Sequence, residues 1–190
     1  MKAIGFFLAL FLWTVPGFSW EVTATPHGLR EASLAGVVKG FETEAPATFK
    51  LQCAPGSDGS MSLIYIVADP KKFPRFPFDD FEGPDAPLAG RDLTTVHLDS
   101  PTGRKSLHTK VGGWFDTGFV FSASQPFGGK GVVREVFEAI RAGAQSLTWE
   151  VSDPRNVAWK LSSVFTLGAV TPELKAYLEA CLAPVPAKSK

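Results

Sequence analysis

The sequence predicts a mainly β protein of the α+β class: an antiparallel β-sandwich or curled sheet with one mid-chain helix and one C-terminal helix. Short segments of alternating apolar and polar residues follow one another along most of the chain, separated by turn sequences. Glycine (18 residues) and proline (15 residues) are frequent, as suits strands joined by turns. Two segments show the apolar periodicity of a helix, and strands in direct succession favour antiparallel pairing.

The first 19 residues have the pattern of a secretory signal peptide. Met1 and Lys2 precede an apolar run from Ile4 to Val15, and Gly17-Phe18-Ser19 places small residues at the −3 and −1 positions of a cleavage site. The run is too short to span a bilayer well, and no stop-transfer segment follows it. We therefore expect a periplasmic or secreted protein without a transmembrane segment after cleavage of residues 1–19; the alternative is a retained N-terminal anchor.

The rest of the chain predicts one β-rich domain over residues 20–182 and a disordered tail over 183–190. Because Lys2 leaves with the signal peptide, 19 basic residues become 18 against 19 acidic ones, which is a net charge of −1. The charges are interspersed and form no basic surface for nucleic acid. The oligomeric state stays open.

Eight strands are expected, at residues 20–25, 47–53, 61–68, 93–99, 106–111, 113–122, 146–152 and 157–165. Residues 29–40 fit either a short helix or an irregular strand. The turn at 54–60 predicts a hairpin, and apolar residues on both faces of 61–68 predict a central strand. The proline-rich stretch 69–90 predicts a long loop with at most one edge strand, near residues 76–81.

Two helices are expected. Residues 132–142 carry an apolar stripe, and Gly143 can cap the end of that helix. Thr171 is a good N-cap for the last helix, with Pro172 at its first position. Three tryptophans at strand positions are expected in the core: Trp114, Trp149 and Trp159.

Cys53 and Cys181 are the only two cysteines. In an exported protein an even pair indicates a disulfide. Cys53 shares a strand face with Phe49 and Leu51, and Cys181 shares a helix face with Leu178, so both thiols are expected to point toward the core. The alternatives are two separate buried thiols or a redox-active pair, and the absence of a Cys-X-X-Cys motif disfavours the latter.

Four features in order along the chain carry a resemblance. The expected mature chain begins Trp20-Glu21-Val22, a strand ends at Cys53, Gly113-Trp114-Phe115 precedes a helix, and a late pair of strands leads to a helix ending in Cys181. This layout resembles the type VI secretion-associated TagO/VasI-like periplasmic proteins over most of residues 20–182. It departs from their basic–acidic pairing after the central strands, where this chain has Val96-His97-Leu98-Asp99. The resemblance implies an accessory envelope protein with a disulfide, and it supplies no catalytic residues.

The sharpest polar feature is an acidic run in the long loop, formed by Asp79, Asp80, Glu82 and Asp85. Oxygen ligands in a loop rich in glycine and proline suit Ca²⁺, although their spacing is not that of an EF-hand. Paired carboxylates could also serve acid–base catalysis. The simplest interpretation is a solvated acidic loop.

The same loop holds four phenylalanines, Phe73, Phe76, Phe78 and Phe81. They either plug the open end of the sheet or form an exposed patch for a partner or an apolar ligand. If the second interpretation holds, Phe76→Asp should abolish partner capture and leave folding intact.

The sequence gives little support for a histidine metal site, a serine hydrolase or an anion-binding glycine loop. His27, His97 and His108 are far apart in sequence, and His97 and His108 are expected to face solvent and not to form a metal pair. There is no Gly-X-Ser-X-Gly elbow of a serine hydrolase. The glycines at 128–131 could bind an anion through backbone N–H groups but are better explained as a turn. No metal or cofactor is predicted.

The first functional hypothesis is therefore an exported, non-catalytic binding module for a protein or envelope component, with the phenylalanine loop as its contact. The rival hypothesis is a hydrolase of an envelope polymer that uses Asp79, Asp80 or Glu82 as acid and base. A carrier of a small apolar ligand is a third possibility, and it requires an internal cavity.

Overall fold

The computed structural model describes residues 19–24, 28–56 and 59–184. Most of the predicted signal peptide (residues 1–18), His27 and most of the predicted tail (residues 185–190) lie outside the described residues.

Within the described residues, ten strands form one sheet: β1 (Glu21–Ala24), β2 (Arg30–Gly40), β3 (Thr43–Cys53), β4 (Ser60–Val67), β5 (Thr94–Ser100), β6 (Gly103–Thr109), β7 (Gly112–Phe115), β8 (Phe119–Pro126), β9 (Ser146–Asp153) and β10 (Asn156–Thr166). The two α-helices are α1 (Val132–Arg141) and α2 (Pro172–Leu182), and the two short 3-10 helices are η1 (Pro70–Lys72) and η2 (Phe78–Phe81).

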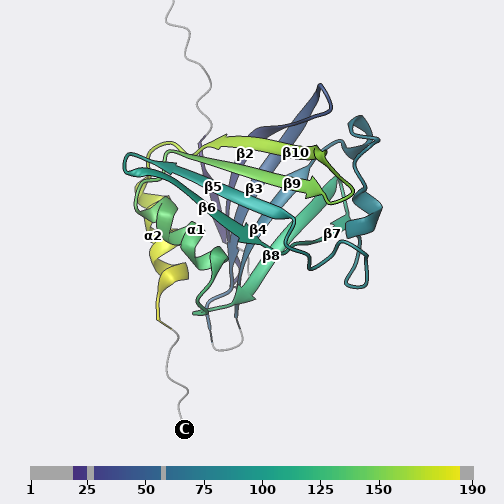
Figure 1. Ribbon diagram of the computed structural model, residues 1–190. Helices are drawn as coiled ribbons and strands as arrows, with labels where there is room; N and C mark the ends of the chain where they lie inside the picture. Colours follow the sequence, from purple (N-terminus) through teal and green to yellow (C-terminus); the bar gives the residue numbers. More distant parts are fainter. Residues whose placement is uncertain (1–18, 25–27, 57–58, 185–190) are drawn as a thin grey trace, which may run out of the picture.

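All pairings between these strands are antiparallel, in the order β6-β5-β9-β10-β2-β3-β4-β8-β7, with β1 added to β2. The sheet curls into a half-barrel, which confirms the predicted curled antiparallel sheet with a mid-chain and a C-terminal helix (Figure 1). Residues 29–40, which were ambiguous, form β2. The predicted strand at 113–122 is two strands, β7 and β8, because the chain turns at Asp116–Gly118, where the Asp116 N–H bonds the Gly118 carbonyl.

The curl follows from how the two outermost strands are connected. β6 pairs with β5 at one edge of the sheet and β7 pairs with β8 at the other edge, yet only Lys110 and Val111 separate β6 from β7. Two residues span only about 7 Å of extended chain. The two edges must therefore approach each other, so the sheet cannot be flat.

The two helices cover one end of the half-barrel, at the left of Figure 1. Helix α1 packs against β4, β6 and β8, and α2 packs against α1, β1 and β2. The buried residues of α1 include Val133, Phe137 and Ile140, as its apolar stripe predicted. Helix α2 begins where predicted, because the Thr171 hydroxyl accepts a hydrogen bond from the Leu174 N–H at 3.2 Å.

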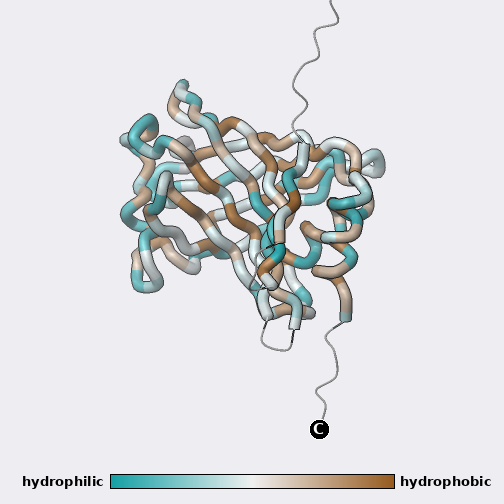
Figure 2. The backbone as a smooth tube through the Cα atoms, turned by 180° about the vertical axis from the view of Figure 1, so that it is seen from behind, coloured by the Kyte–Doolittle hydropathy of each residue, from teal (hydrophilic) through white to brown (hydrophobic). Residues whose placement is uncertain are grey.

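The interior is filled by inward-facing side chains of alternate strand residues, and apolar residues follow the strands in Figure 2. Tyr65 lies at its centre, stacked on Trp149 and Phe121 with ring centroids 5.5 and 5.8 Å apart. Its hydroxyl is 2.8 Å from the Ser163 hydroxyl, and burial raises the pKa of Tyr65.

The tryptophan predictions have different outcomes. Trp149 is fully buried, as predicted. Trp114 is 44% exposed, so its predicted core position is wrong: it lies on the four-residue edge strand β7, where few neighbours can cover a side chain. Trp159 is only partly buried and contacts Phe41 at the tip of the β2–β3 hairpin, with ring centroids 6.4 Å apart.

Candidate functional site

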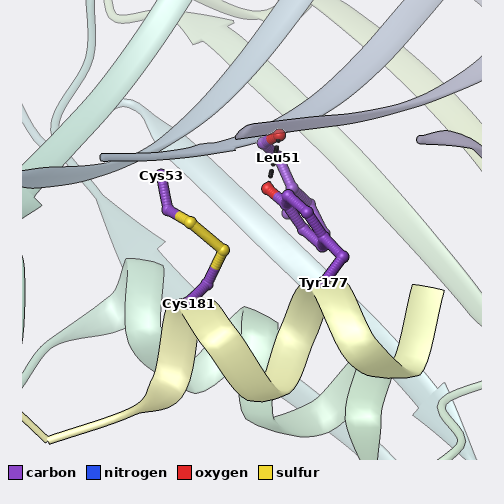
Figure 3. The surroundings of a disulfide bond; sticks show 4 residues. All are labelled: Leu51, Cys53, Tyr177 and Cys181. Atoms are coloured by element: carbon purple, nitrogen blue, oxygen red, sulfur yellow. Dashed lines mark hydrogen bonds between the residues drawn. A yellow bond between two sulfur atoms is a disulfide. The ribbon is translucent and has the colours of Figure 1, made fainter. Parts of the chain in front are cut away.

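The helix end of the half-barrel is closed by the predicted disulfide (Figure 3). Cys53 ends β3 and Cys181 lies in the last turn of α2, with Cα atoms 5.8 Å apart and a sequence separation of 128. Both cysteines are fully buried, as their strand and helix faces predicted. About one turn earlier in α2, the Tyr177 hydroxyl donates to the Leu51 carbonyl at 2.7 Å. This end is a structural anchor with no exposed thiol.

The opposite end, at the right of Figure 1, carries the long loop between β4 and β5. Its four phenylalanines, Phe73, Phe76, Phe78 and Phe81, are at most 6% exposed. Phe81 packs edge-on against Phe121 (5.4 Å between centroids) and Phe78 packs against Phe119 (4.9 Å). The rings therefore plug this end and do not form the exposed patch proposed as the alternative.

The burial of these rings changes one sequence-based expectation. Phe76 is 4% exposed, so Phe76→Asp would place a carboxylate in the core and is expected to unfold the protein. The segment at residues 76–81 forms η2 and no strand, which agrees with a long loop holding at most one edge strand. The prolines leave no run of residues long enough for a strand.

The four carboxylates of the acidic run lie in different surroundings. Asp79, Glu82 and Asp85 are exposed, and Asp80 is engaged by Arg155, with 3.0 Å between its Oδ2 and the guanidinium Nη1. Across the described part of the chain, no three His, Cys, Asp or Glu side chains are grouped so that they could hold a metal ion. The calcium cluster of Asp79, Asp80, Glu82 and Asp85 is therefore not assembled in the described part of the chain, and the acid–base role of these carboxylates stays a prediction.

Arg155 joins the loop to the sheet through a second carboxylate, that of Asp153, and the sequence patterns singled out neither residue. Asp153 is fully buried at the end of β9 and accepts hydrogen bonds from the Arg155 backbone N–H (2.9 Å) and guanidinium Nε (3.0 Å). Burial by itself would raise the pKa of Asp153, but the hydrogen bonds and charge of Arg155 outweigh it and lower that pKa. Arg155 thus bridges a buried carboxylate and the loop carboxylate of Asp80.

A groove of about 450 Å³ is formed by this loop together with Phe115 and Arg155. Its apolar wall consists of Pro70, Pro74, Pro77, Phe73, Phe76, Phe78 and Phe115. Its charged residues are Lys71, Arg75, Arg155, Asp79 and Asp80. Phe115, the last residue of β7, is 43% exposed and offers the accessible aromatic surface. We call this hollow the loop-end groove.

A second hollow of about 460 Å³ borders the loop-end groove, since Pro74 and Arg75 line both. Its other side is the tip of the β2–β3 hairpin, where Phe41 and Glu42 have positive φ angles of 52° and 63°. Turns of this kind favour Asn and Gly, so the two larger residues impose strain on the backbone. The contact of Phe41 with Trp159 helps to hold the tip in place.

Some charged side chains of the loop-end groove are paired with another described residue, and others are not. Asp80 is matched by Arg155. Neither Lys71 nor Arg75 has a hydrogen bond or ion pair from its side chain to another described residue, and both are exposed. The exposed Asp79 carboxylate is likewise unmatched within the described residues. Two unpaired cations against one unpaired anion leave the groove with an excess of available positive charge.

The remaining sequence candidates lie elsewhere. His97 and His108 are on adjacent strands but not opposite each other, since His97 pairs with Ser106 and His108 with Thr95. The His97 Nδ1 is 2.8 Å from the Ser106 hydroxyl. At the glycines 128–131, the Gln125 amide donates to the Gly129 carbonyl at 2.7 Å, so that turn is organised by the chain itself.

No helix among the described residues is long and apolar enough to cross a membrane. No family model, no curated protein and no solved structure matches the chain. The candidate site therefore rests on the geometry of the loop-end groove alone.

Proposed function

We propose that the protein is an exported, non-catalytic binding module that holds a protein or envelope component in the loop-end groove. The observation that carries the proposal is the combination, in one open hollow, of a half-exposed Phe115 with the unpaired cations Lys71 and Arg75. Unpaired charge beside an accessible aromatic ring is typical of a surface that gains its missing contacts from a partner.

Export is supported by two features of the chain. The first 19 residues have signal-peptide character, and a disulfide persists in oxidising compartments such as the periplasm or the extracellular space. The resemblance to TagO/VasI-like periplasmic proteins agrees with an accessory role in the envelope. A hydrolase gains no support, because the Asp80 carboxylate that would act as acid or base is already paired with Arg155.

Site-specific photocrosslinking tests the proposal. A photoreactive phenylalanine analogue replaces Phe115 in the full-length chain, which is expressed in its own cells and irradiated, and adducts are identified by mass spectrometry. A matched chain carries the analogue at Arg141, which is exposed at the helix end. We expect one discrete adduct from position 115 and none from position 141. Identical adduct patterns at both positions, or no adduct at position 115, would contradict the proposal.

A further inference from the structure

We infer that the partner presents an extended acidic peptide segment, with carboxylates beside Lys71 and Arg75 and an apolar side chain against Phe115. This inference rests on the proposed function and names the chemistry of its ligand.

The unpaired cations of the groove indicate that the ligand carries negative charge. Lys71 and Arg75 flank the groove without a partner among the described residues, whereas Arg155 is already shared by Asp80 and Asp153. A guanidinium binds a carboxylate through two parallel hydrogen bonds, so Arg75 is suited to an aspartate, a glutamate or a chain-terminal carboxylate. Asp79 in the groove and Glu42 in the adjoining hollow are exposed carboxylates without a partner among the described residues, and the cations Lys71, Lys72 and Arg75 outnumber them.

The apolar part of the groove favours a peptide over an anionic glycan. The described lining of the loop-end groove consists of proline, phenylalanine and charged residues. Sugar hydroxyl groups placed against proline and phenylalanine would lack hydrogen-bond partners, whereas an apolar side chain of a peptide loses no hydrogen bond there. In the adjoining hollow the neutral polar side chain is Thr43, whose hydroxyl already donates to the Phe41 carbonyl at 3.4 Å. An acidic peptide requires only cations and apolar surface.

The position of Arg75 favours an extended segment. Pro74 and Arg75 line both the loop-end groove and the second hollow, so Arg75 lies at the border between the two. A segment that contacts Phe115 and Arg75 and extends further reaches the second hollow, which is also lined by Lys72 and Glu42. A compact small molecule would occupy only one of the two hollows.

The walls are stiff before any ligand arrives. Prolines 70, 74 and 77 restrict the backbone, the rings of Phe76 and Phe78 are buried beneath it, and the Arg155–Asp80 ion pair ties η2 to the β9–β10 turn. A preformed site loses little conformational entropy on binding, so a short peptide can bind measurably.

Fluorescence anisotropy tests the inference on the purified, disulfide-bonded protein. The probe is a fluorescein-labelled nonapeptide repeating Glu-Glu-Phe, and the comparison probes repeat Gln-Gln-Phe and Lys-Lys-Phe. We expect binding of the acidic probe only, and this binding should weaken as salt is raised to about 0.5 M, because salt screens exposed charges. Polygalacturonate, an anionic glycan, is added as a competitor and should not displace the probe at equal carboxylate concentration.

Matched variants locate the binding. Arg75→Gln and Lys71→Gln should each weaken binding of the acidic probe roughly tenfold, the usual effect of losing a hydrogen bond to a charged group. Arg141→Gln makes the same change at the helix end and should leave the affinity unaltered. Unchanged thermal melting of all three variants shows that folding is intact.

Several outcomes overturn the inference: equal binding of the neutral probe, displacement by polygalacturonate, or equal loss in Arg141→Gln. If the acidic probe does not bind but the crosslink from position 115 persists, the peptide chemistry is wrong and the binding module stands. If both are absent, the proposed function fails together with the inference.

Discussion

The two ends of the half-barrel are closed by different means. At the helix end, two helices and the Cys53–Cys181 bond cover the core. At the loop end, a proline-rich segment is held by packed phenylalanine rings and by Arg155. Exposed cations without a partner among the described residues occur at both ends, Arg141 on α1 and Lys71 and Arg75 at the loop, but only at the loop end do they line a groove together with a half-exposed aromatic ring, Phe115. The covalent end therefore serves as the anchor, and the loop end is where we propose a surface for binding.

Removal of the disulfide should have the largest effect. We expect Cys53→Ser/Cys181→Ser to lower the free energy of unfolding by about 4–5 kcal/mol, because the bond restricts a very long loop in the unfolded chain. Urea denaturation followed by tryptophan fluorescence measures this loss, with reduced wild-type protein as the control. A loss below about 1 kcal/mol would mean that helix packing alone holds this end.

Shortening a buried phenylalanine of the loop should cause the second-largest loss of stability. Phe81 is fully buried and contacts Phe76 and Phe121, so Phe81→Ala should cost about 3–4 kcal/mol through lost contacts and a cavity. The same urea titration measures it. Phe115→Ala is the matched control at a half-exposed ring and should cost much less. Similar costs for the two variants would contradict the distinction between plug and groove wall.

The buried carboxylate at the loop end should make stability depend on pH. The pKa of Asp153 is lower in the folded protein than the value of about 3.9 in an unfolded chain. Its stabilisation is therefore fully present above about pH 4 and is lost as the pH falls through the folded pKa. Asp153→Asn should lower the free energy of unfolding by about 1 kcal/mol at neutral pH and by less at acidic pH. A constant difference across this range would refute the assignment.

The smallest effect is expected from the equivalent ion pair at the helix end. Hydrogen bonds from Arg104 and from the Ser146 hydroxyl lower the pKa of Asp99 to about 2. Its stabilisation is complete above the unfolded pKa and declines as the pH falls toward about 2. Because the pair is exposed, Asp99→Asn should reduce the melting temperature less than Asp153→Asn does. Thermal melts of both variants between neutral and acidic pH make the comparison, and the reverse order would contradict it.

The sequence by itself determined much of the secondary structure and the anchor at the helix end. Local periodicity assigns a side chain to one face of an element, so the buried sides of Cys53, Cys181 and α1 could be derived without knowledge of the fold. Turn and capping residues likewise located the β3–β4 hairpin and the start of α2 at Thr171. These features depend on residues that are close together in the chain.

Only the tertiary structure decided which surfaces are covered. The same phenylalanine-rich loop could plug the sheet or face solvent, and the choice depends on the space left by Phe119 and Phe121, far along the chain. The exposure of Trp114 and the pairing of Arg155 with Asp80 depend on distant contacts in the same way. Burial is a property of the assembled neighbours, so local pattern cannot distinguish a residue that fills a core from one that lines a groove.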